Sequence, residues 1–428
     1  MKHTYFSHSL GCKVNSYETA ALTTELAQRG YSPVAEVADA EVILINTCSV
    51  TARADQKSRQ HISSYRKTNP NAIVVVMGCY SQSHENECLA LGADIVVGAS
   101  ARSRLPDYLE RFKTERKPIV DIKPNMRRES FEELGIQTYC ENTRAYLKVQ
   151  DGCNNFCSYC YIPFLRGNSR SRDPRAVVEE SVRLVERGIQ EIVITGIHIG
   201  AYGLDLADGS FRLADLIEAI LNKCPTLPRL RISSIEESEI DDRFLSVLQQ
   251  YPQIVDHLHI PLQSGSSSVL RRMKRKYDTK AFLEKLTKIR KVRPGVAITT
   301  DVIAGYPEET EEEWSETVDF CKKANFSEIH VFPFSSRPKT YAATLPDLPP
   351  EAKKARVKEL MLLSREMRNR YEESFFGKEL PVLFESYDSK NHLAYGHTSN
   401  YLLVKIPSDK PLDGCWKNLV YISSMVAD

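Results

Sequence analysis

Three cysteines with short, regular spacing lie near the middle of the chain. Cys153, Cys157 and Cys160 are separated by three and then by two residues. This spacing lets three thiolates surround one face of a 4Fe–4S cubane, so that the fourth iron has no protein ligand. An open metal position is typical of a site that performs chemistry, because a reactant can bind there. The spacing therefore predicts a reactive iron–sulfur cluster on this segment.

Zinc binding and a disulfide are the two simpler interpretations of the same segment. Zinc in a structural site takes four ligands, but no His or Cys occurs in the dozen residues that follow Cys160. A disulfide would leave one of the three cysteines unpaired. Both interpretations explain the spacing less well than a cluster does.

A second set of three cysteines is spread over the N-terminal region. Each follows a short apolar stretch that is typical of a buried strand: Cys12, Cys48 and Cys79. In a parallel sheet the carboxyl ends of the strands share one edge, where such sheets bind ligands. We therefore expect these thiols to converge on a second cluster, with Gly11 and Gly78 allowing close approach of the backbone.

The composition places these sites in a large and nearly neutral protein. The 428 residues include 57 basic and 56 acidic side chains, so a nucleic acid would have to be bound by local patches. Eleven cysteines in a chain of this length indicate free thiols in a reducing compartment, and for Cys88 and Cys140 we expect ordinary burial. No apolar stretch is long enough for a signal sequence or a membrane span, so we expect a soluble, cytoplasmic protein without a membrane partner.

The elements that must position the cysteines alternate between strands and helices. Over residues 1–112 we expect an open parallel α/β sheet, with strands at 5–7, 42–45, 73–76 and 95–97 and helices such as 17–29 and 52–67. Residues 113–143 mix charges and prolines, and we expect a linker with one strand at 119–122.

Over residues 144–376 the alternation predicts a partial barrel and one further helix. Six apolar strands are expected at 146–149, 192–194, 230–232, 257–260, 297–303 and 329–332. Six βα units are two short of a closed barrel, so we expect an open (β/α)6 barrel with its chemistry at the carboxyl ends of the strands. The Cys153 loop follows the first strand, and polar segments follow others. We expect His198, in one of these segments, to be a loop histidine rather than a ligand, and the charged helix 349–373 to be solvated.

The tail, residues 377–428, changes to short strands separated by turns, at 380–384, 401–406 and 419–422. This pattern predicts a small antiparallel β-barrel of the OB-like kind, which often binds oligonucleotides. A purely structural cap is the alternative.

Together these features resemble the methylthiotransferase family of radical S-adenosylmethionine (SAM) enzymes. The order of the parts matches over nearly the whole chain: a three-cysteine N-terminal domain, a Cys-x3-Cys-x2-Cys barrel and a C-terminal TRAM domain. The segment Ser9–Asn15, with Lys13 and Val14 after the first cysteine, is similar to the branch that modifies N6-threonylcarbamoyladenosine at position 37 of tRNA. The isopentenyladenosine branch typically has Gln-Met after that cysteine, and the branch that modifies a ribosomal-protein aspartate has Pro-Lys.

The resemblance implies a transferase that uses two 4Fe–4S clusters and two molecules of SAM. Cys153, Cys157 and Cys160 would bind the cluster that cleaves SAM to produce a radical. Cys12, Cys48 and Cys79 would bind the cluster that delivers a methylated sulfur to carbon 2 of the adenine. The expected SAM-binding residues are at strand ends or beside the cluster: Tyr159, Gly196, Ser233, Glu236, Val302 and Gly305.

The implied partner is the anticodon stem–loop of tRNA. Phosphate contacts are expected from basic residues near both cysteine sites and in the run 271–276: Arg53, Lys57, Arg59, Arg166, Arg170, Arg172, Arg271 and Lys274. Three aromatic residues are candidates for stacking on bases, with packing at the barrel rim as the alternative for the last two: Tyr80, Tyr161 and Phe164. The family also implies an electron donor, such as flavodoxin or ferredoxin, and a sulfur source.

Two other hypotheses remain open from the sequence. The first is that the same chemistry acts on isopentenyladenosine 37 or on a ribosomal-protein aspartate, which the mass of the modified tRNA or protein would distinguish. A non-catalytic iron–sulfur protein that binds RNA is the second hypothesis, and such a protein would not cleave SAM.

Overall fold

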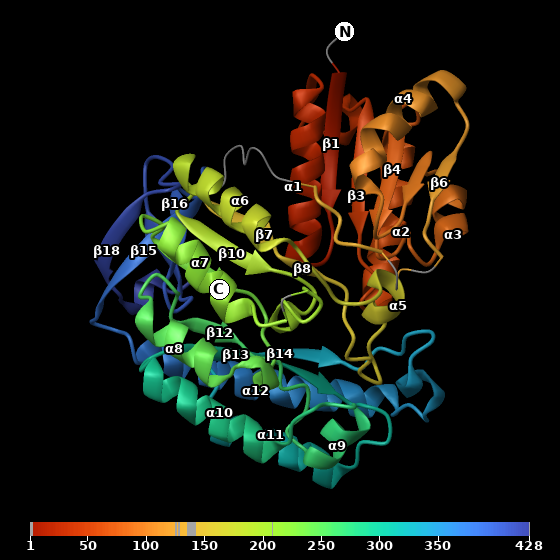
Figure 1. Ribbon diagram of the computed structural model, residues 1–428. Helices are drawn as coiled ribbons and strands as arrows, with labels where there is room; N and C mark the ends of the chain where they lie inside the picture. Colours follow the sequence, from red (N-terminus) through yellow and green to blue (C-terminus); the bar gives the residue numbers. More distant parts are fainter. Residues whose placement is uncertain (1–2, 125, 127–128, 135–142, 208, 428) are drawn as a thin grey trace.

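The computed structural model (Figure 1) describes residues 3–124, 126, 129–134, 143–207 and 209–427. These residues form a six-stranded parallel sheet, two three-stranded parallel sheets that continue one another, and a four-stranded antiparallel sheet. The expected α/β fold class is therefore confirmed. Cys140 and much of the expected linker lie outside the described residues.

The N-terminal sheet is parallel throughout, with the order β2-β1-β3-β4-β5-β6. Its strands are β1 (His3–Ser9), β2 (Tyr31–Pro33), β3 (Val42–Thr47), β4 (Ile73–Gly78), β5 (Ile95–Val97) and β6 (Ile119–Asp121). Helices α1 (Lys13–Gln28), α2 (Ala52–Thr68), α3 (Glu85–Ala90) and α4 (Leu105–Glu115) connect them. Every residue of β3 and β4 is buried, because helices cover both faces of the sheet.

Two strands of this sheet differ from the expectation. The three-residue strand β2 was not expected, because it is short and ends in Pro33, a residue that is unusual in strands. The expected linker strand is β6, which pairs with β5. The N-terminal sheet thus continues into the region that we expected to be a linker.

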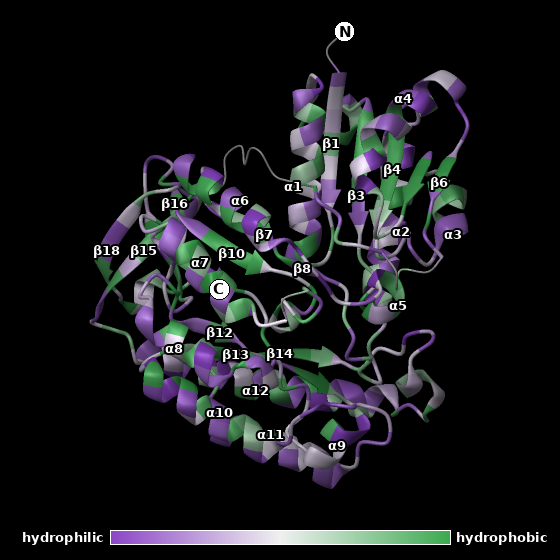
Figure 2. Cartoon of the chain, viewed as in Figure 1, coloured by the Kyte–Doolittle hydropathy of each residue, from purple (hydrophilic) through white to green (hydrophobic). Residues whose placement is uncertain are grey.

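The second unit is a partial barrel of the six expected parallel strands. They are β7 (Arg144–Lys148), β10 (Glu191–Thr195), β11 (Arg229–Ile232), β12 (His257–His259), β13 (Ala297–Ala304) and β14 (Glu328–Pro333). A bridge between Ser234 and His259 links β11 to β12, so the two three-stranded sheets form one curved layer with β7 and β14 at its edges. The outer helices are α6 (Pro174–Glu186), α7 (Leu213–Lys223), α8 (Asp242–Gln250), α9 (Ser267–Arg272), α10 (Thr279–Val292), α11 (Glu311–Ala324) and α12 (Pro350–Glu373). Figure 2 shows the hydrophobic residues concentrated in the strands and the hydrophilic residues on the outer helices.

The C-terminal sheet is antiparallel, with the order β17-β16-β15-β18. Its strands are β15 (Glu379–Asp388), β16 (Leu393–Thr398), β17 (Leu403–Pro407) and β18 (Trp416–Val420). It packs on the amino-terminal ends of the barrel strands, where Arg229 donates hydrogen bonds of 2.8 Å to the carbonyl oxygens of His397 and Pro381. The carboxyl ends of the barrel strands are thus left open.

The N-terminal sheet lies beside the barrel, with α1 against β7 (Figure 1). A short hairpin of β8 (Gln150–Asp151) and β9 (Arg170–Ser171) and the helix α5 (Ile162–Arg166) lie between the two units. This segment follows β7 and contains the three closely spaced cysteines. No helix among the described residues is long and apolar enough to cross a membrane.

Candidate active site

The loop site, as we call Cys153, Cys157 and Cys160, is a segment fixed by its own backbone. The amide of Cys153 donates to the carbonyl of Gly167 (3.0 Å), and the amide of Cys160 donates to that of Cys157 (2.9 Å). The amide of Ser158 donates to the carbonyl of Met273 (3.1 Å), which ties the loop to the barrel rim. These bonds hold three half-buried thiols on one turn of chain.

The thiols of the loop site lie close enough together to affect one another's titration. Burial and the neighbouring Cys157 and Cys153 raise the pKa of Cys160 to about 12. These thiols are therefore neutral without a metal, and a bound metal would deprotonate them. Arg275, which is almost fully buried, donates from Nη1 to the sulfur of Cys157 (3.3 Å). The residues present therefore fit a cluster with three thiolate ligands.

A polar rim beside the loop site contains Asn155 and Glu239, which the sequence did not single out, together with Glu236, which it did. Arg275 also donates to Glu236 (2.9 Å), and Asn155 donates from its side chain to Glu236 (3.2 Å). His198 is buried and pairs with Glu239. Although burial alone would lower it, hydrogen bonds to Cys153 and Glu239 raise the pKa of His198 to about 10. We expected His198 to be an ordinary loop histidine. It does lie in a loop, but it also bonds to Cys153 of the loop site.

The strand-end site, as we call Cys12, Cys48 and Cys79, lies at the carboxyl ends of β1, β3 and β4. Asn15 joins two of these ends, because its side chain donates to the carbonyl oxygens of Leu10 (2.7 Å) and Thr47 (3.1 Å). Gly11 has a φ of +95°, and a Cβ there would lie 2.7 Å from the sulfur of Cys48. Only glycine fits this contact, as the sequence predicted.

The thiols of the strand-end site also lie close enough to affect one another. Burial, and then the neighbouring Cys79 and Cys12, raise the pKa of Cys48 to about 12. The structure thus brings these thiols together from distant parts of the chain. They fit a second three-thiolate cluster by the same criterion as the loop site.

Arg166 connects the strand-end site to the barrel. Its Nε lies 3.3 Å from the sulfur of Cys79, and its Nη1 lies 2.8 Å from Glu18 on α1 and 3.2 Å from Asp151 on β8. Its side chain is fully buried, and Lys148 and Arg102 pair with the same two carboxylates. This buried ion network therefore joins the N-terminal sheet to the barrel next to Cys79.

The three arginines that follow the loop site do not form a surface patch. Arg166, Arg170 and Arg172 are all buried. Arg170 pairs with Asp151 (3.3 Å) and Arg172 with Glu180 (2.7 Å). The expectation of phosphate contacts from these three residues is wrong, since their guanidinium groups are already paired with carboxylates inside the protein.

Packed side chains connect the two cysteine sites. Tyr161, directly after Cys160, is buried against Cys79. The guanidinium of Arg337 lies 5.3 Å from the centre of the Tyr161 ring and bonds to Ser49 (2.9 Å) and Asp55 (2.7 Å), just after Cys48. A buried tyrosine and a buried arginine thus hold the two sites side by side.

All the residues expected to bind SAM except Tyr159 lie at or just after the carboxyl ends of barrel strands. Gly196 follows β10 and packs on Gln150, while Ser233 follows β11. Val302 and Gly305 lie at the end of β13, and the Gly305 amide donates to Glu309 (3.0 Å). Among the expected SAM-binding residues, Glu236 is bonded to the rim of the loop site. Tyr159 is partly buried in an apolar cluster beneath the same loop.

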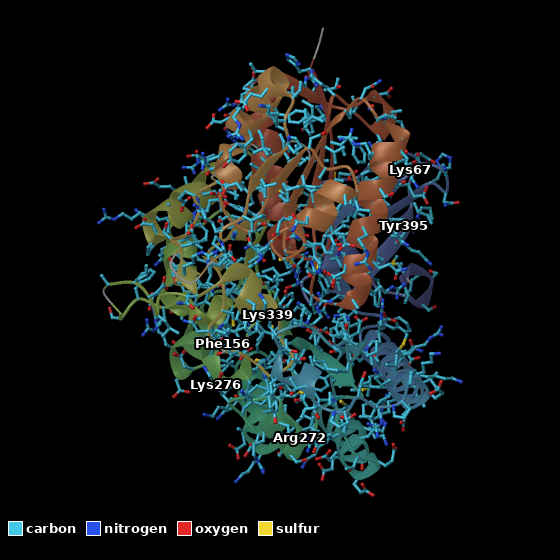
Figure 3. The ribbon with its side chains drawn as sticks, turned by 90° about the vertical axis from the view of Figure 1, so that its right-hand side faces the viewer. Lys67, Phe156, Arg272, Lys276, Lys339 and Tyr395 are labelled. Carbon is cyan, nitrogen blue, oxygen red and sulfur yellow. The ribbon has the colours of Figure 1, made fainter. Side chains whose placement is uncertain are left out.

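The remaining basic and aromatic candidates differ in exposure. Arg53 and Lys57 are exposed and line a hollow of about 750 Å³ that also contains Cys48. Arg271 and Lys274 are exposed, whereas Arg59 lies 3.8 Å from Glu87. Tyr80 and Tyr161 are buried, which leaves Phe164 available for stacking on a base. Phe164 makes an edge contact with Phe156, and Figure 3 shows Phe156 on the same face as Lys276, Lys339 and Arg272.

Comparison with known proteins supports the two-part organisation of the site. Residues 4–98 match a family described as "Uncharacterized protein family UPF0004", and residues 147–321 match the "Radical SAM superfamily". A solved structure of the radical S-adenosylmethionine methyltransferase TsrM from Kitasatospora setae, with a 4Fe–4S cluster bound, superposes with a TM-score of 0.57 at 16% identity. The match covers 80% of this chain and 77% of that chain. The fold is therefore that of the radical SAM enzymes.

Two curated relatives extend the comparison over almost the whole chain. The threonylcarbamoyladenosine tRNA methylthiotransferase MtaB of Bacillus subtilis is 42% identical over 413 residues, which are 95% of this chain and 91% of the relative. The tRNA-2-methylthio-N(6)-dimethylallyladenosine synthase of the same organism is 32% identical over 420 residues, covering 96% and 82%. The chain belongs to the methylthiotransferase family of radical SAM enzymes, and it is a transferase that uses SAM and 4Fe–4S clusters.

Proposed function

We propose that this protein adds a methylthio group to carbon 2 of N6-threonylcarbamoyladenosine at position 37 of tRNA. The observation that carries the proposal is the pair of neighbouring three-thiol sites, in a chain that is 42% identical to a threonylcarbamoyladenosine tRNA methylthiotransferase. The relative that acts on dimethylallyladenosine is less similar, at 32% identity. The Lys-Val pair after Cys12 favours the same choice.

Each set of three cysteines would hold its own cluster, and the two clusters would have different roles. Cys153, Cys157 and Cys160 would hold one cluster, and Cys12, Cys48 and Cys79 would hold the other. When bound, the cluster at the loop site with SAM supplies the one-electron chemistry that activates a carbon–hydrogen bond, and the cluster at the strand-end site supplies sulfur. Because the two sites are neighbours in the fold, a single bound nucleobase would be within reach of both.

The surrounding residues orient these groups and exclude water. Arg275 and Arg166 each donate a hydrogen bond to one sulfur and so hold it in place. Buried Tyr306, whose hydroxyl lies 2.8 Å from that of Ser158, closes the base of the loop site. Glu236 is the best-placed candidate for contact with SAM, since it is already bonded to the loop rim. The further SAM contacts proposed are Tyr159, Gly196, Ser233, Val302 and Gly305.

The partners follow from this chemistry. The substrate would be the anticodon stem–loop of tRNA, approached by Arg53, Lys57, Arg271 and Lys274 and by a C-terminal domain of the TRAM kind. A low-potential donor such as flavodoxin or ferredoxin would supply electrons, and a separate source would supply sulfur. Both requirements suit a cytoplasmic enzyme. The proposed domains are an N-terminal three-cysteine domain, a radical SAM barrel and the C-terminal sheet.

Mass spectrometry of tRNA nucleosides tests the proposal directly. Deletion of the gene should remove 2-methylthio-N6-threonylcarbamoyladenosine and leave N6-threonylcarbamoyladenosine in its place. Loss of the methylthio group from isopentenyladenosine, or from a ribosomal-protein aspartate, would instead assign one of the other substrates. A purified, reduced protein that fails to cleave SAM would support the non-catalytic alternative.

A further inference from the structure

A groove leads away from the strand-end site, and most of its length lies beyond the residues to which a role has been given above. Its first part is the hollow of about 750 Å³ that contains Cys48, Arg53 and Lys57. A second hollow of about 620 Å³ shares Pro333 and Phe334 with the first and extends along α12. A third, of about 590 Å³, shares Val331 and Phe332 with the first and continues toward the C-terminal sheet. We call the three together the basic groove.

Most of the cations that line the basic groove have no carboxylate partner among the described residues. Five basic side chains line its first two hollows without an ion pair to any carboxylate in the described part of the chain: Arg53, Lys57, Lys354, Lys358 and Arg365. A sixth, Lys353, pairs with Asp347 (2.6 Å). No carboxylate lines these two hollows among the described residues. The carboxylates of the third hollow, Glu328 and Glu372, both lie within 3.7 Å of Arg368. In a chain of net charge +1, such a local excess indicates an anionic partner.

The floor of the basic groove is apolar as well as basic. Phe332, at the end of β14, is 43% exposed, and Met361 and Leu362 on α12 are 58% and 56% exposed. A ligand that offered only phosphate would leave this apolar surface in water. A nucleotide chain offers both kinds of surface, because its phosphates attract cations and its bases stack on apolar and aromatic side chains.

The arrangement along α12 suits an extended chain. Lys354 and Lys358 are one helical turn apart, about 6 Å, and Arg365 follows two turns later, about 10 Å further along. Lys67, at the far end of α2, and Tyr395, on β16, are seen on one side of the molecule in Figure 3. Helix α2 contributes Arg53 and Lys57 to the first hollow, and Val426, which follows the C-terminal sheet, lines the third.

We infer that the basic groove binds the single-stranded nucleotides next to the nucleotide that reacts at the two cysteine sites. This inference rests on the proposed tRNA methylthiotransferase function and adds the track that the loop of the RNA follows. The phosphates lie against Arg53, Lys57 and the cations of α12, and at least one base stacks on Phe332. The open edge of β14 would also suit an extended peptide, but a peptide gives no reason for five cations without partners.

The test measures binding of a fluorescent RNA hairpin that carries N6-threonylcarbamoyladenosine in its loop, by anisotropy, over a series of KCl concentrations. The test variant combines Lys354→Gln, Lys358→Gln and Arg365→Gln, all exposed and with little change in helix propensity. The matched control combines Lys280→Gln, Lys288→Gln and Lys291→Gln on α10, which removes the same charge away from the groove. Iron content and circular dichroism confirm that each cluster-loaded variant is folded.

The groove variant should bind the hairpin about tenfold more weakly at low salt, and the slope of log K against log salt concentration should decrease by about two. The α10 control should change neither quantity appreciably. Phe332→Ala should weaken binding about tenfold without changing the slope, because stacking does not release counterions. Leu204→Ala, at another exposed apolar residue, serves as its control.

The outcomes separate this inference from the proposed function. Equal affinity and slope for the parent, the groove variant and the α10 control would overturn the inference that the basic groove binds RNA, even if the parent methylthiolates the hairpin. A groove variant that binds RNA normally but loses affinity for an extended peptide would overturn it in favour of strand addition. A parent that binds the hairpin through the groove but produces no methylthio nucleoside would overturn the proposed function alone.

Discussion

The two cysteine sites are built in opposite ways. The loop site takes its three thiols from eight consecutive residues, and local backbone hydrogen bonds hold them. The strand-end site takes its thiols from three strand ends that meet only after the N-terminal sheet has formed. The spacing of the cysteines in the sequence defines the loop site, whereas the order of the strands in the N-terminal sheet brings the strand-end cysteines together.

At each site an arginine donates a hydrogen bond to a cysteine sulfur, but only at the loop site does that arginine belong to the same unit as the cysteines. Arg275, which donates to Cys157, belongs to the same barrel as the loop site. Arg166, which donates to Cys79, reaches the N-terminal sheet from the barrel side through the network with Glu18 and Asp151. The strand-end site therefore depends on the docking of the two units, whereas the loop site depends on the barrel alone.

The largest expected effect separates the two sites by role. Cys157→Ala should abolish both 5′-deoxyadenosine and the methylthio product, because the loop site supports SAM cleavage. Cys48→Ala should retain 5′-deoxyadenosine and lose the product. Both compounds are measured in one anaerobic reaction with tRNA, on variants that circular dichroism shows to be folded. A folded Cys48→Ala protein that still forms the methylthio product would contradict this division.

The next effect tests the dependence on docking. Arg166→Met leaves Glu18 and Asp151 with one cation fewer in the interior and should cost about 3 kcal/mol or more in unfolding free energy. Reconstituted iron should fall from about eight per chain to about four, since each three-thiol site holds a four-iron cluster. Iron analysis and urea denaturation provide the measurements.

Arg172→Met is the matched control for this variant. Arg172 is equally buried and pairs with Glu180 and Glu133, and none of its partners in the described part of the chain is a cysteine of either site. The control should lose comparable stability and keep about eight irons. If Arg166→Met also kept eight irons, the docking dependence would be rejected.

Most of the strands could be predicted from the sequence, because buried parallel strands are continuous apolar runs. All six barrel strands and four of the N-terminal strands have this pattern. The strand β16 was missed because its residues, Leu-Ala-Tyr-Gly-His-Thr, offer little apolar signal. The strand β6 was recognised, but its sheet was not, since pairing between distant segments is not visible in local periodicity.

The cysteines of the site could be predicted, but their surroundings could not. Arg166 stands in a basic run that looks like a phosphate-binding patch, and its burial depends on Glu18, which is distant in the sequence. Similarly, Met361 and Leu362 on a helix would ordinarily indicate burial, yet both are exposed. Which charges are paired and which apolar residues are covered depends on tertiary contacts, which spacing does not specify.

A smaller effect tests whether the barrel can be weakened without affecting the strand-end site. Glu191 is buried among Arg231, Arg144 and Arg229. Burial by itself would raise the pKa of Glu191. These arginines outweigh that effect and lower the pKa of Glu191 to about 2, below the ordinary 4.5. The stabilisation is therefore complete above pH 4.5 and is lost as the pH falls through about 2. Its size is about 3 kcal/mol.

Urea denaturation of the metal-free protein between pH 2.5 and 6 measures this contribution. Glu191→Gln should lower the unfolding free energy at pH 6 and flatten its decrease toward acid pH. Iron at the strand-end site should remain, because Glu191 lies at the opposite ends of the barrel strands. Loss of that iron would mean that the two sites are coupled through the whole barrel.

The smallest effect concerns the donor to the loop site. A hydrogen bond to a thiolate ligand favours the reduced cluster, which carries more negative charge. Arg275→Lys retains a positive charge but cannot bond to both Glu236 and Cys157 in the same planar geometry. The reduction potential should therefore become more negative, by an amount on the order of 50 mV for a hydrogen bond of about 1 kcal/mol. Redox titration followed by electron paramagnetic resonance gives the potential, and Arg272→Lys, whose side chain pairs with Glu313, is the control. Equal reduction potentials in the parent and both variants would show that Arg275 positions the polar rim but does not change the potential of the cluster. Arg275 and Arg166 would then resemble each other only in their position beside a cysteine sulfur.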